Sequence, residues 1–106
     1  MRLINKTLGI ELEVQSGDIL GRKEGRFAEV LRGFEQISRR HCRFVFDPSS
    51  GWTVTDLGST NGTKYNGKLL QPGQACPLRD DSFLLVGNIE FYVQIEDVAN
   101  EKTKRM

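Results

Sequence analysis

The chain has 106 residues, a formal net charge of +1, and 38% hydrophobic and 27% charged residues. This length suits one domain that buries a hydrophobic core without needing disulfide bonds or a bound metal for stability. The charge argues against bulk electrostatic binding of nucleic acid, no apolar run is long enough to cross a membrane, and the first residues lack the apolar segment of a signal peptide. We therefore expect an intracellular protein of the cytoplasm or nucleus, bound to neither nucleic acid nor membrane.

Alternating apolar and polar residues predict a series of short strands. In residues 9–15 the apolar side chains Ile10, Leu12 and Val14 share one face. The predicted strands are residues 9–15, 19–22, 40–46, 52–55, 83–86 and 89–95. Short strands separated by frequent turns are typical of an all-β sandwich or barrel. Within the third strand Cys42, Phe44 and Phe46 fall on one face.

One segment has a helical period. In residues 27–37 the apolar residues recur at helical spacing, and Gly33 weakens the pattern. We predict one or two helical turns inside a long connection, with the apolar stripe pinning this loop to the sandwich rather than binding a partner.

The two cysteines, Cys42 and Cys76, are far apart in the sequence, and the chain has one histidine. These spacings predict no zinc site, no metal and no cofactor. Both thiols are expected to be buried and free.

Residues 57–67, LGSTNGTKYNG, contain two Asn-Gly pairs. This pair is the strongest short-range signal for a tight hairpin turn, because both central positions favour φ > 0. The first turn also carries hydroxyl and amide side chains, those of Ser59, Thr60, Asn61 and Thr63, which could shape a corner or hold a ligand.

Ser38 and His41 invite a nucleophile–base interpretation. Their spacing on a strand entry gives poor geometry for that pair, and no glycine elbow surrounds the serine. We therefore predict that the chain is not an enzyme.

The remaining polar groups lie at strand ends and in loops, which gather at the poles of a sandwich. Arg22 ends one predicted strand, Ser38 and Arg39 open another, and Thr60 and Asn61 lie on the first Asn-Gly turn. If they share one pole, guanidinium, hydroxyl and amide groups would form a site suited to a phosphate dianion. That set of residues includes no acid or base suited to catalysing a reaction of the phosphate, so the site would bind the phosphate without reaction.

These pieces, in this order, resemble a forkhead-associated (FHA) domain. The matching motifs are Gly21-Arg22, then SRRH at 38–41, then DLGSTNGT at 56–63 and Asn66-Gly67, within residues 9–96. The long connection between Arg22 and Ser38 is a departure from the family pattern. The resemblance implies a β-sandwich of about eleven mostly antiparallel strands, with a short helical turn before residue 38, that binds phosphothreonine peptides through loops at one pole.

The resemblance also implies a role for each site residue. Arg22, Ser38, Arg39 and Thr60 would hold the phosphate, and Asn61 would hydrogen-bond the peptide backbone. Gln36 would read the side chain three positions after the phosphothreonine. The loop-bracing residues would be Gly21, His41, Gly62, Asn66 and Gly67.

We expect an FHA domain over residues 1–98 and a polar C-terminal tail over 99–106. The expected partner is a phosphothreonine protein or peptide made by a Ser/Thr kinase, in trans or in the same polypeptide. Two alternatives stay open: a structural or oligomerisation domain of the same fold that binds a non-phosphorylated protein, and an anion or nucleotide binder that uses the same pole.

Overall fold

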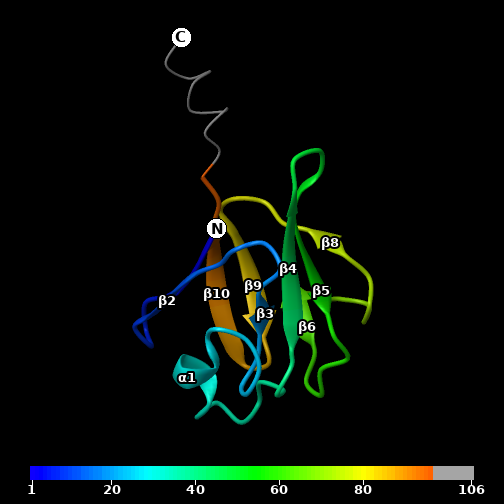
Figure 1. Ribbon diagram of the computed structural model, residues 1–106. Helices are drawn as coiled ribbons and strands as arrows, with labels where there is room; N and C mark the ends of the chain where they lie inside the picture. Colours follow the sequence, from blue (N-terminus) through cyan, green and yellow to red (C-terminus); the bar gives the residue numbers. More distant parts are fainter. Residues whose placement is uncertain (97–106) are drawn as a thin grey trace.

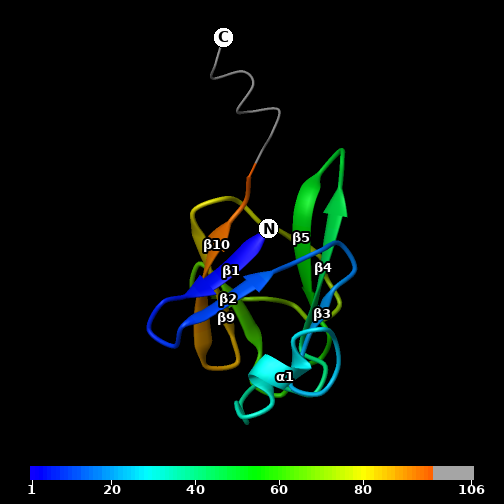
Figure 2. The same cartoon turned by 60° about the vertical axis from the view of Figure 1, so that its left-hand side comes forward.

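The computed structural model describes residues 1–96, which form two antiparallel sheets with one short helix at their lower end (Figure 1). The larger sheet has the order β2-β1-β10-β9-β6-β7, with β1 Arg2–Asn5, β2 Ile10–Glu13, β6 Thr63–Tyr65, β7 Lys68–Leu69, β9 Ser82–Val86 and β10 Ile89–Gln94. The smaller sheet has the order β3-β4-β5-β8, with β3 Ile19–Leu20, β4 Cys42–Asp47, β5 Gly51–Asp56 and β8 Cys76–Pro77. Figure 2 shows the two layers side by side. The predicted all-β sandwich is confirmed, with ten strands in the described residues where about eleven were expected.

Each of the six predicted strands is present, with ends that differ from the predicted ones by at most two residues. The strands that the pattern did not predict are β1, β6, β7 and β8. Apart from β1 these span two or three residues, too few for a period-2 pattern to stand out. They exist because neighbouring strands supply their backbone partners, as β9 does for β6.

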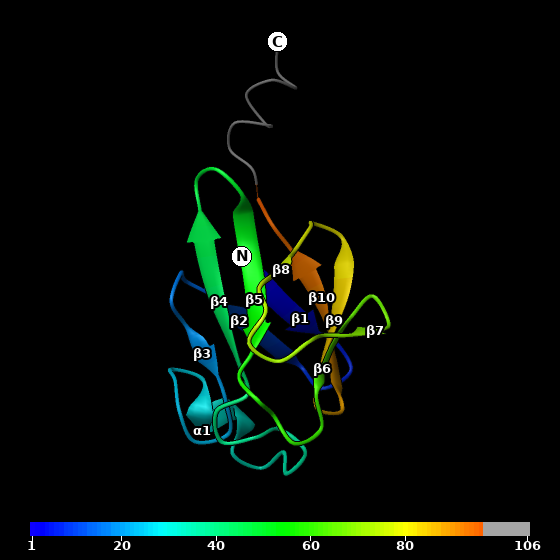
Figure 3. The same cartoon turned by 90° about the vertical axis from the view of Figure 1, so that its right-hand side faces the viewer.

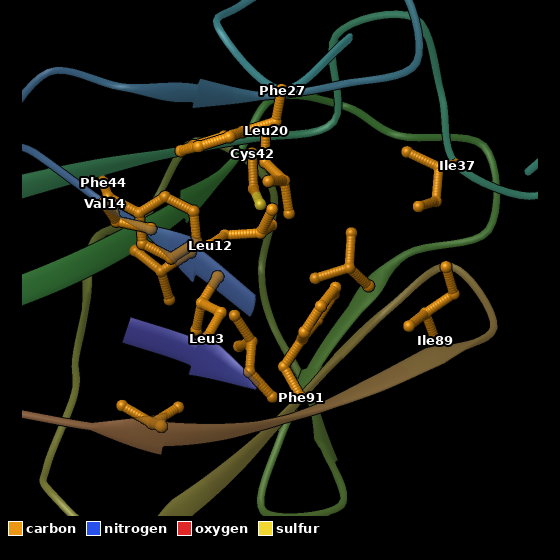
Figure 4. Packing of buried hydrophobic residues seen from close by; sticks show 14 of the residues in the cluster. Leu3, Leu12, Val14, Leu20, Phe27, Ile37, Cys42, Phe44, Ile89 and Phe91 are labelled. Carbon is orange, nitrogen blue, oxygen red and sulfur yellow. The ribbon is translucent and has the colours of Figure 1, made fainter. Parts of the chain in front are cut away.

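The core lies between the sheets, where alternate residues of facing strands meet. Figure 4 shows Phe44 of the smaller sheet near Leu12 and Val14, and Leu3 near Phe91 in the larger sheet. Phe46 follows Phe44 on the same face of β4 but lies outside the core, since it is 45% exposed. The β4–β5 hairpin projects beyond the rest of the sandwich (Figure 1), so Phe46 packs on Trp52 at a ring separation of 5.4 Å instead.

The connection between β3 and β4 contains the helix α1, Ala28–Leu31. Phe27, Leu31 and Ile37 are buried in the core, whereas Val30 points to solvent. The prediction of a short helical turn whose apolar stripe pins the loop is therefore confirmed. This anchoring holds the ends of a long loop in fixed positions at one pole.

Cys42 and Cys76 are both free thiols. Cys42 is fully buried, and burial raises the pKa of its thiol far above the usual range. Cys76 is only half-buried on the short strand β8, so the expectation that both are buried is wrong for this residue.

Among residues 1–96, no helix is long and apolar enough to cross a membrane. The predicted boundary at residue 98 and the polar tail over 99–106 lie outside the described residues.

Candidate functional site

Three loops meet at the pole that also carries α1, at the lower end of the molecule in Figure 3. The first follows β3, the second precedes β4, and the third joins β5 to β6. Backbone and side-chain hydrogen bonds join each loop to the next. The structure therefore brings the predicted site residues of these loops to one place.

Arg22 and Ser38 lie next to each other where the first two loops run together. The Arg22 backbone N–H donates to the Ser38 carbonyl at 3.0 Å, and its Nε donates to the Ile37 carbonyl at 2.9 Å. Within residues 1–96 the terminal Nη groups of Arg22 form no hydrogen bond or ion pair. The guanidinium is thus held at one edge and keeps its forked donors available.

The Ser38 hydroxyl joins the second loop to the third. Its Oγ accepts a hydrogen bond from the Thr60 backbone N–H at 2.9 Å, which leaves the hydroxyl proton free to donate. The Asn61 side chain donates from Nδ2 to the Gln36 carbonyl at 2.9 Å, and its Oδ1 stays available as an acceptor. Thr60 and Asn61 are exposed at the surface of the pole.

His41 lies beneath these loops and is fully buried. Its Nδ1 accepts from the Ser38 backbone N–H at 3.0 Å, and its Nε2 lies 2.9 Å from the Gly62 carbonyl, to which it must donate. The ring is therefore neutral, with each nitrogen tied to a different loop. Burial lowers the pKa of His41, and the opposing effect of the Gly62 carbonyl is smaller.

This geometry also bears on the nucleophile–base interpretation. His41 contacts the Ser38 backbone rather than its hydroxyl, and both ring nitrogens are already used. A base must reach the proton that it removes. In this arrangement His41 cannot remove the proton of the Ser38 hydroxyl.

Asp56 builds the third loop, a role that sequence reasoning missed. Its buried carboxylate accepts from the backbone N–H groups of Gly58 and Ser59 and from the hydroxyls of Ser59 and Thr63. Burial opposes its ionisation, but these hydrogen bonds outweigh that effect and hold the pKa of Asp56 below its usual value. An Asp that ends a strand just before a Gly-Ser turn was the signal that could have revealed it.

Two glycines allow the loops to approach this closely. A Cβ on Gly21 would collide with the Arg39 carbonyl oxygen. A Cβ on Gly87, in the β9–β10 turn, would lie 2.5 Å from the Gln36 carbonyl oxygen. Gly62, the carbonyl partner of His41, has φ +85° in the first Asn-Gly turn.

Arg39 is exposed at the edge of the same pole, where its carbonyl accepts from the N–H groups of Lys23 and Glu24. Asn66 and Gly67 lie elsewhere. They form the turn of the β6–β7 hairpin with φ of 48° and 85°, at the opposite end of β6 from Gly62. Asn66 braces the adjoining strand there by exchanging hydrogen bonds with the backbone of Phe83.

Comparison with known proteins gives consistent similarity to one family. The sequence model of the FHA domain matches residues 19–87. An FHA domain-containing protein of Arabidopsis thaliana is 33% identical over 103 residues, which cover 86% of this chain and 26% of that protein. An E3 ubiquitin-protein ligase, rnf8 of Danio rerio, is 41% identical over 51 residues, which cover 48% of this chain and 10% of the ligase. The chain thus spans a small part of the curated relatives that it matches.

Solved structures show the same likeness. An FHA domain from a structural and functional analysis of phosphothreonine-dependent FHA domain interactions superposes with a TM-score of 0.68 at 26% identity, over 92% of this chain and 95% of that one. The FhaA FHA domain, complexed with the intracellular domain of Rv3910, superposes with a TM-score of 0.67 at 27% identity, over 86% and 93% of the two chains.

Proposed function

This chain belongs to the FHA domain family, and we propose that it is a phosphopeptide-binding module that recognises phosphothreonine through the loops at one pole. The observation that carries the proposal is the junction of the three loops at Ser38. There the Thr60 N–H donates to the Ser38 hydroxyl, and the Arg22 N–H donates to the Ser38 carbonyl. One FHA domain of similar structure is described for phosphothreonine-dependent interactions, which supports the same ligand class here.

The phosphate would be held by donors that converge from separate loops. Arg22 would offer its free Nη groups, Ser38 its hydroxyl proton, Arg39 its guanidinium and Thr60 its hydroxyl. Asn61 would accept a peptide backbone N–H through Oδ1, and Gln36 would contact the residue three positions after the phosphothreonine. The supporting geometry for Asn61 is its bond to the Gln36 carbonyl, which orients the amide without using Oδ1.

The energetics predict strong discrimination against unmodified threonine. A hydrogen bond to a charged group contributes about 1.5–3 kcal/mol, so losing several at once removes measurable binding. Phosphoserine lacks one methyl group, which costs about 1–3 kcal/mol in a fitted pocket. The expected order is phosphothreonine, then phosphoserine, with unmodified threonine unbound.

The expected partner is a protein or peptide phosphorylated by a Ser/Thr kinase, in a separate chain or in the same polypeptide. Because both ring nitrogens of His41 are already hydrogen-bonded and cannot activate Ser38, we expect the module to bind its ligand without chemical turnover. The phosphothreonine would then serve as a signal that assembles two proteins.

Titration of a degenerate phosphothreonine peptide library by fluorescence anisotropy tests the proposal. We expect saturable binding by the native protein and no measurable binding by Arg22→Ala or Ser38→Ala, with thermal melting preserved in both variants. Arg79→Ala removes an exposed cation far along the chain from the three loops and should bind as the native protein does.

Normal binding by either site variant would overturn the assignment of the phosphate site. Equal binding of the unphosphorylated library would instead favour the alternative, an FHA-fold interaction domain for a non-phosphorylated partner. Displacement of the peptide by a free nucleotide would favour a general anion binder.

A further inference from the structure

Basic residues gather on one side of the pole, where the loop after β3 crosses the loop before β4. The backbone N–H groups of Lys23 and Glu24 both donate to the Arg39 carbonyl, at 3.2 and 3.0 Å. This crossing places Lys23 next to Arg22 in one loop, and Arg39 next to Arg40 in the other. Four cationic residues therefore share a small area beside Ser38.

These cations are poorly neutralised by the protein itself. The Glu24 Oε2 atom lies 3.7 Å from the Arg40 Nε atom, and both side chains are half-exposed. Within residues 1–96, Lys23 and Arg39 form no ion pair. Among the described residues, the Glu24 carboxylate is therefore the one acidic group that forms an ion pair with any of these four cationic residues.

The opposite side of the pole has a different charge. There the second loop passes Gln36, whose carbonyl receives the Asn61 amide and packs against Gly87 of the larger sheet. The neighbouring exposed residue is Glu35. The residues at the loop crossing are thus mainly basic, and those next to Gln36 near the larger sheet are neutral or acidic.

One phosphate does not use all the cations on the basic side. The donors proposed for a single dianion are those of Arg22, Ser38, Arg39 and Thr60. Lys23 and Arg40 are then available to bind a second anionic group. Separating Glu24 from Arg40 costs little, because an exposed ion pair contributes little to stability.

We infer that the module prefers phosphothreonine peptides that carry a second anionic side chain on one side of the phosphothreonine, and that Lys23 and Arg40 bind it. The inference rests on the proposed function, since the phosphothreonine sets the register that brings the second anion to these residues. The acidic Glu35 side disfavours the same charge on the other flank.

The test compares peptides that differ only in their flanks. The parent peptide has a phosphothreonine between neutral Ala, Ser and Gln residues. Two series place Asp or phosphoserine two and three positions before it, or two and three positions after it. Dissociation constants are measured for the native protein, for Lys23→Gln/Arg40→Gln, and for Lys6→Gln/Arg79→Gln, a double variant with the same charge change at exposed positions outside the three loops.

We expect Asp on one flank to tighten binding about threefold to fivefold in about 50 mM salt, with a larger gain for phosphoserine and most of the gain lost in about 500 mM salt. Acid on the other flank should give no gain. Lys23→Gln/Arg40→Gln should bind the parent peptide as the native protein does and lose the gain, whereas Lys6→Gln/Arg79→Gln should keep it. Lys23→Gln alone should lose part of the gain, which provides the test if the double variant does not fold.

A native protein that binds the parent peptide without any flank preference would overturn the inference and leave the proposed function standing. So would a preference that survives in Lys23→Gln/Arg40→Gln. If no phosphothreonine peptide binds, the proposed function fails and the inference fails with it.

Discussion

Two buried polar residues, Asp56 and His41, hold the loops of the candidate site in place. Both are buried, whereas the residues proposed to bind the peptide lie at the surface of the pole. Asp56 satisfies the backbone and hydroxyl donors of the third loop, and His41 ties that loop to Ser38. Buried polar groups that are fully hydrogen-bonded give a loop one defined conformation.

Replacing Asp56 should destabilise the domain through the donors that it leaves behind. In Asp56→Ala the buried Thr63 hydroxyl and the N–H groups of Gly58 and Ser59 lose their acceptor. A buried unsatisfied group costs about 1–3 kcal/mol, so we expect a loss of about 3 kcal/mol in the free energy of unfolding, measured with urea. Asp47→Ala removes only a bond to Ser49 in an exposed turn and should cost less than about 1 kcal/mol. Equal losses in the two variants would contradict the role of Asp56.

The stability of the domain should depend on pH through His41. Its pKa in the folded protein is lowered by burial, so the unfolded chain binds more protons as the pH falls through about 6.5. The contribution of neutral His41 to the free energy of unfolding is therefore fully present above that pH. It is lost as the pH falls from there through the pKa of His41 in the folded protein. Urea unfolding at several pH values measures this loss.

His41→Ala provides the comparison for that pH profile. It should lower the free energy of unfolding by about 1–3 kcal/mol at neutral pH, because the Ser38 N–H and the Gly62 carbonyl lose their partner. It should also remove the decline near pH 6.5. A variant with unchanged stability at neutral pH would contradict the bracing role.

At the scale of the elements, the site depends on how closely the loops approach one another. The strand β3 is only two residues long, and the loop after it lies directly on the loop before β4. Such close backbone contact requires a glycine at position 21. In the sequence this glycine is visible only as part of a Gly-Arg pair.

Gly21→Ala should therefore separate these two loops. The added methyl group collides with the Arg39 carbonyl, so the backbone must shift and the Arg22 and Ser38 groups move apart. We expect loss of phosphopeptide binding together with a loss of about 1–3 kcal/mol in stability. Gly33→Ala, in the same long connection, meets no atom within 4 Å and should leave binding unchanged. Binding that survives in Gly21→Ala would show that close contact between the loops is not required.

Sequence patterns found the longer strands and missed most of the short ones. The alternation in residues 9–15 and 89–95 reflects strands buried on one face, as Ile10 and Leu12 confirm. Strands such as β7 and β8 carry two residues each, too few for alternation to stand out, and β8 pairs with β5, which is distant in the chain. Phe46 shows that alternation gives the face of a strand but not the extent of the opposite sheet, since it lies outside the core.

For the whole molecule, the predicted domain boundary is a separate proposal. The described core residues and all three loops of the candidate site lie within residues 1–96. We therefore expect the chain ending at residue 98 to melt at the same temperature as the full chain and to bind the same phosphothreonine library. Thermal denaturation and anisotropy titration check this, and a lower melting temperature would move the boundary into residues 99–106.

The sequence alone was enough to indicate the all-β class, the short helical turn, the Asn-Gly hairpin at 66–67 and the resemblance to the FHA family. These are local signals, since periodicity and turn chemistry act over a few residues. Only the tertiary structure decided that Arg22, Ser38 and Thr60 meet at one pole while Asn66 and Gly67 do not, that Asp56 builds the third loop, and that the cations cluster on one side. Those facts depend on contacts between segments that the chain brings together only when the two sheets pack and the loops cross.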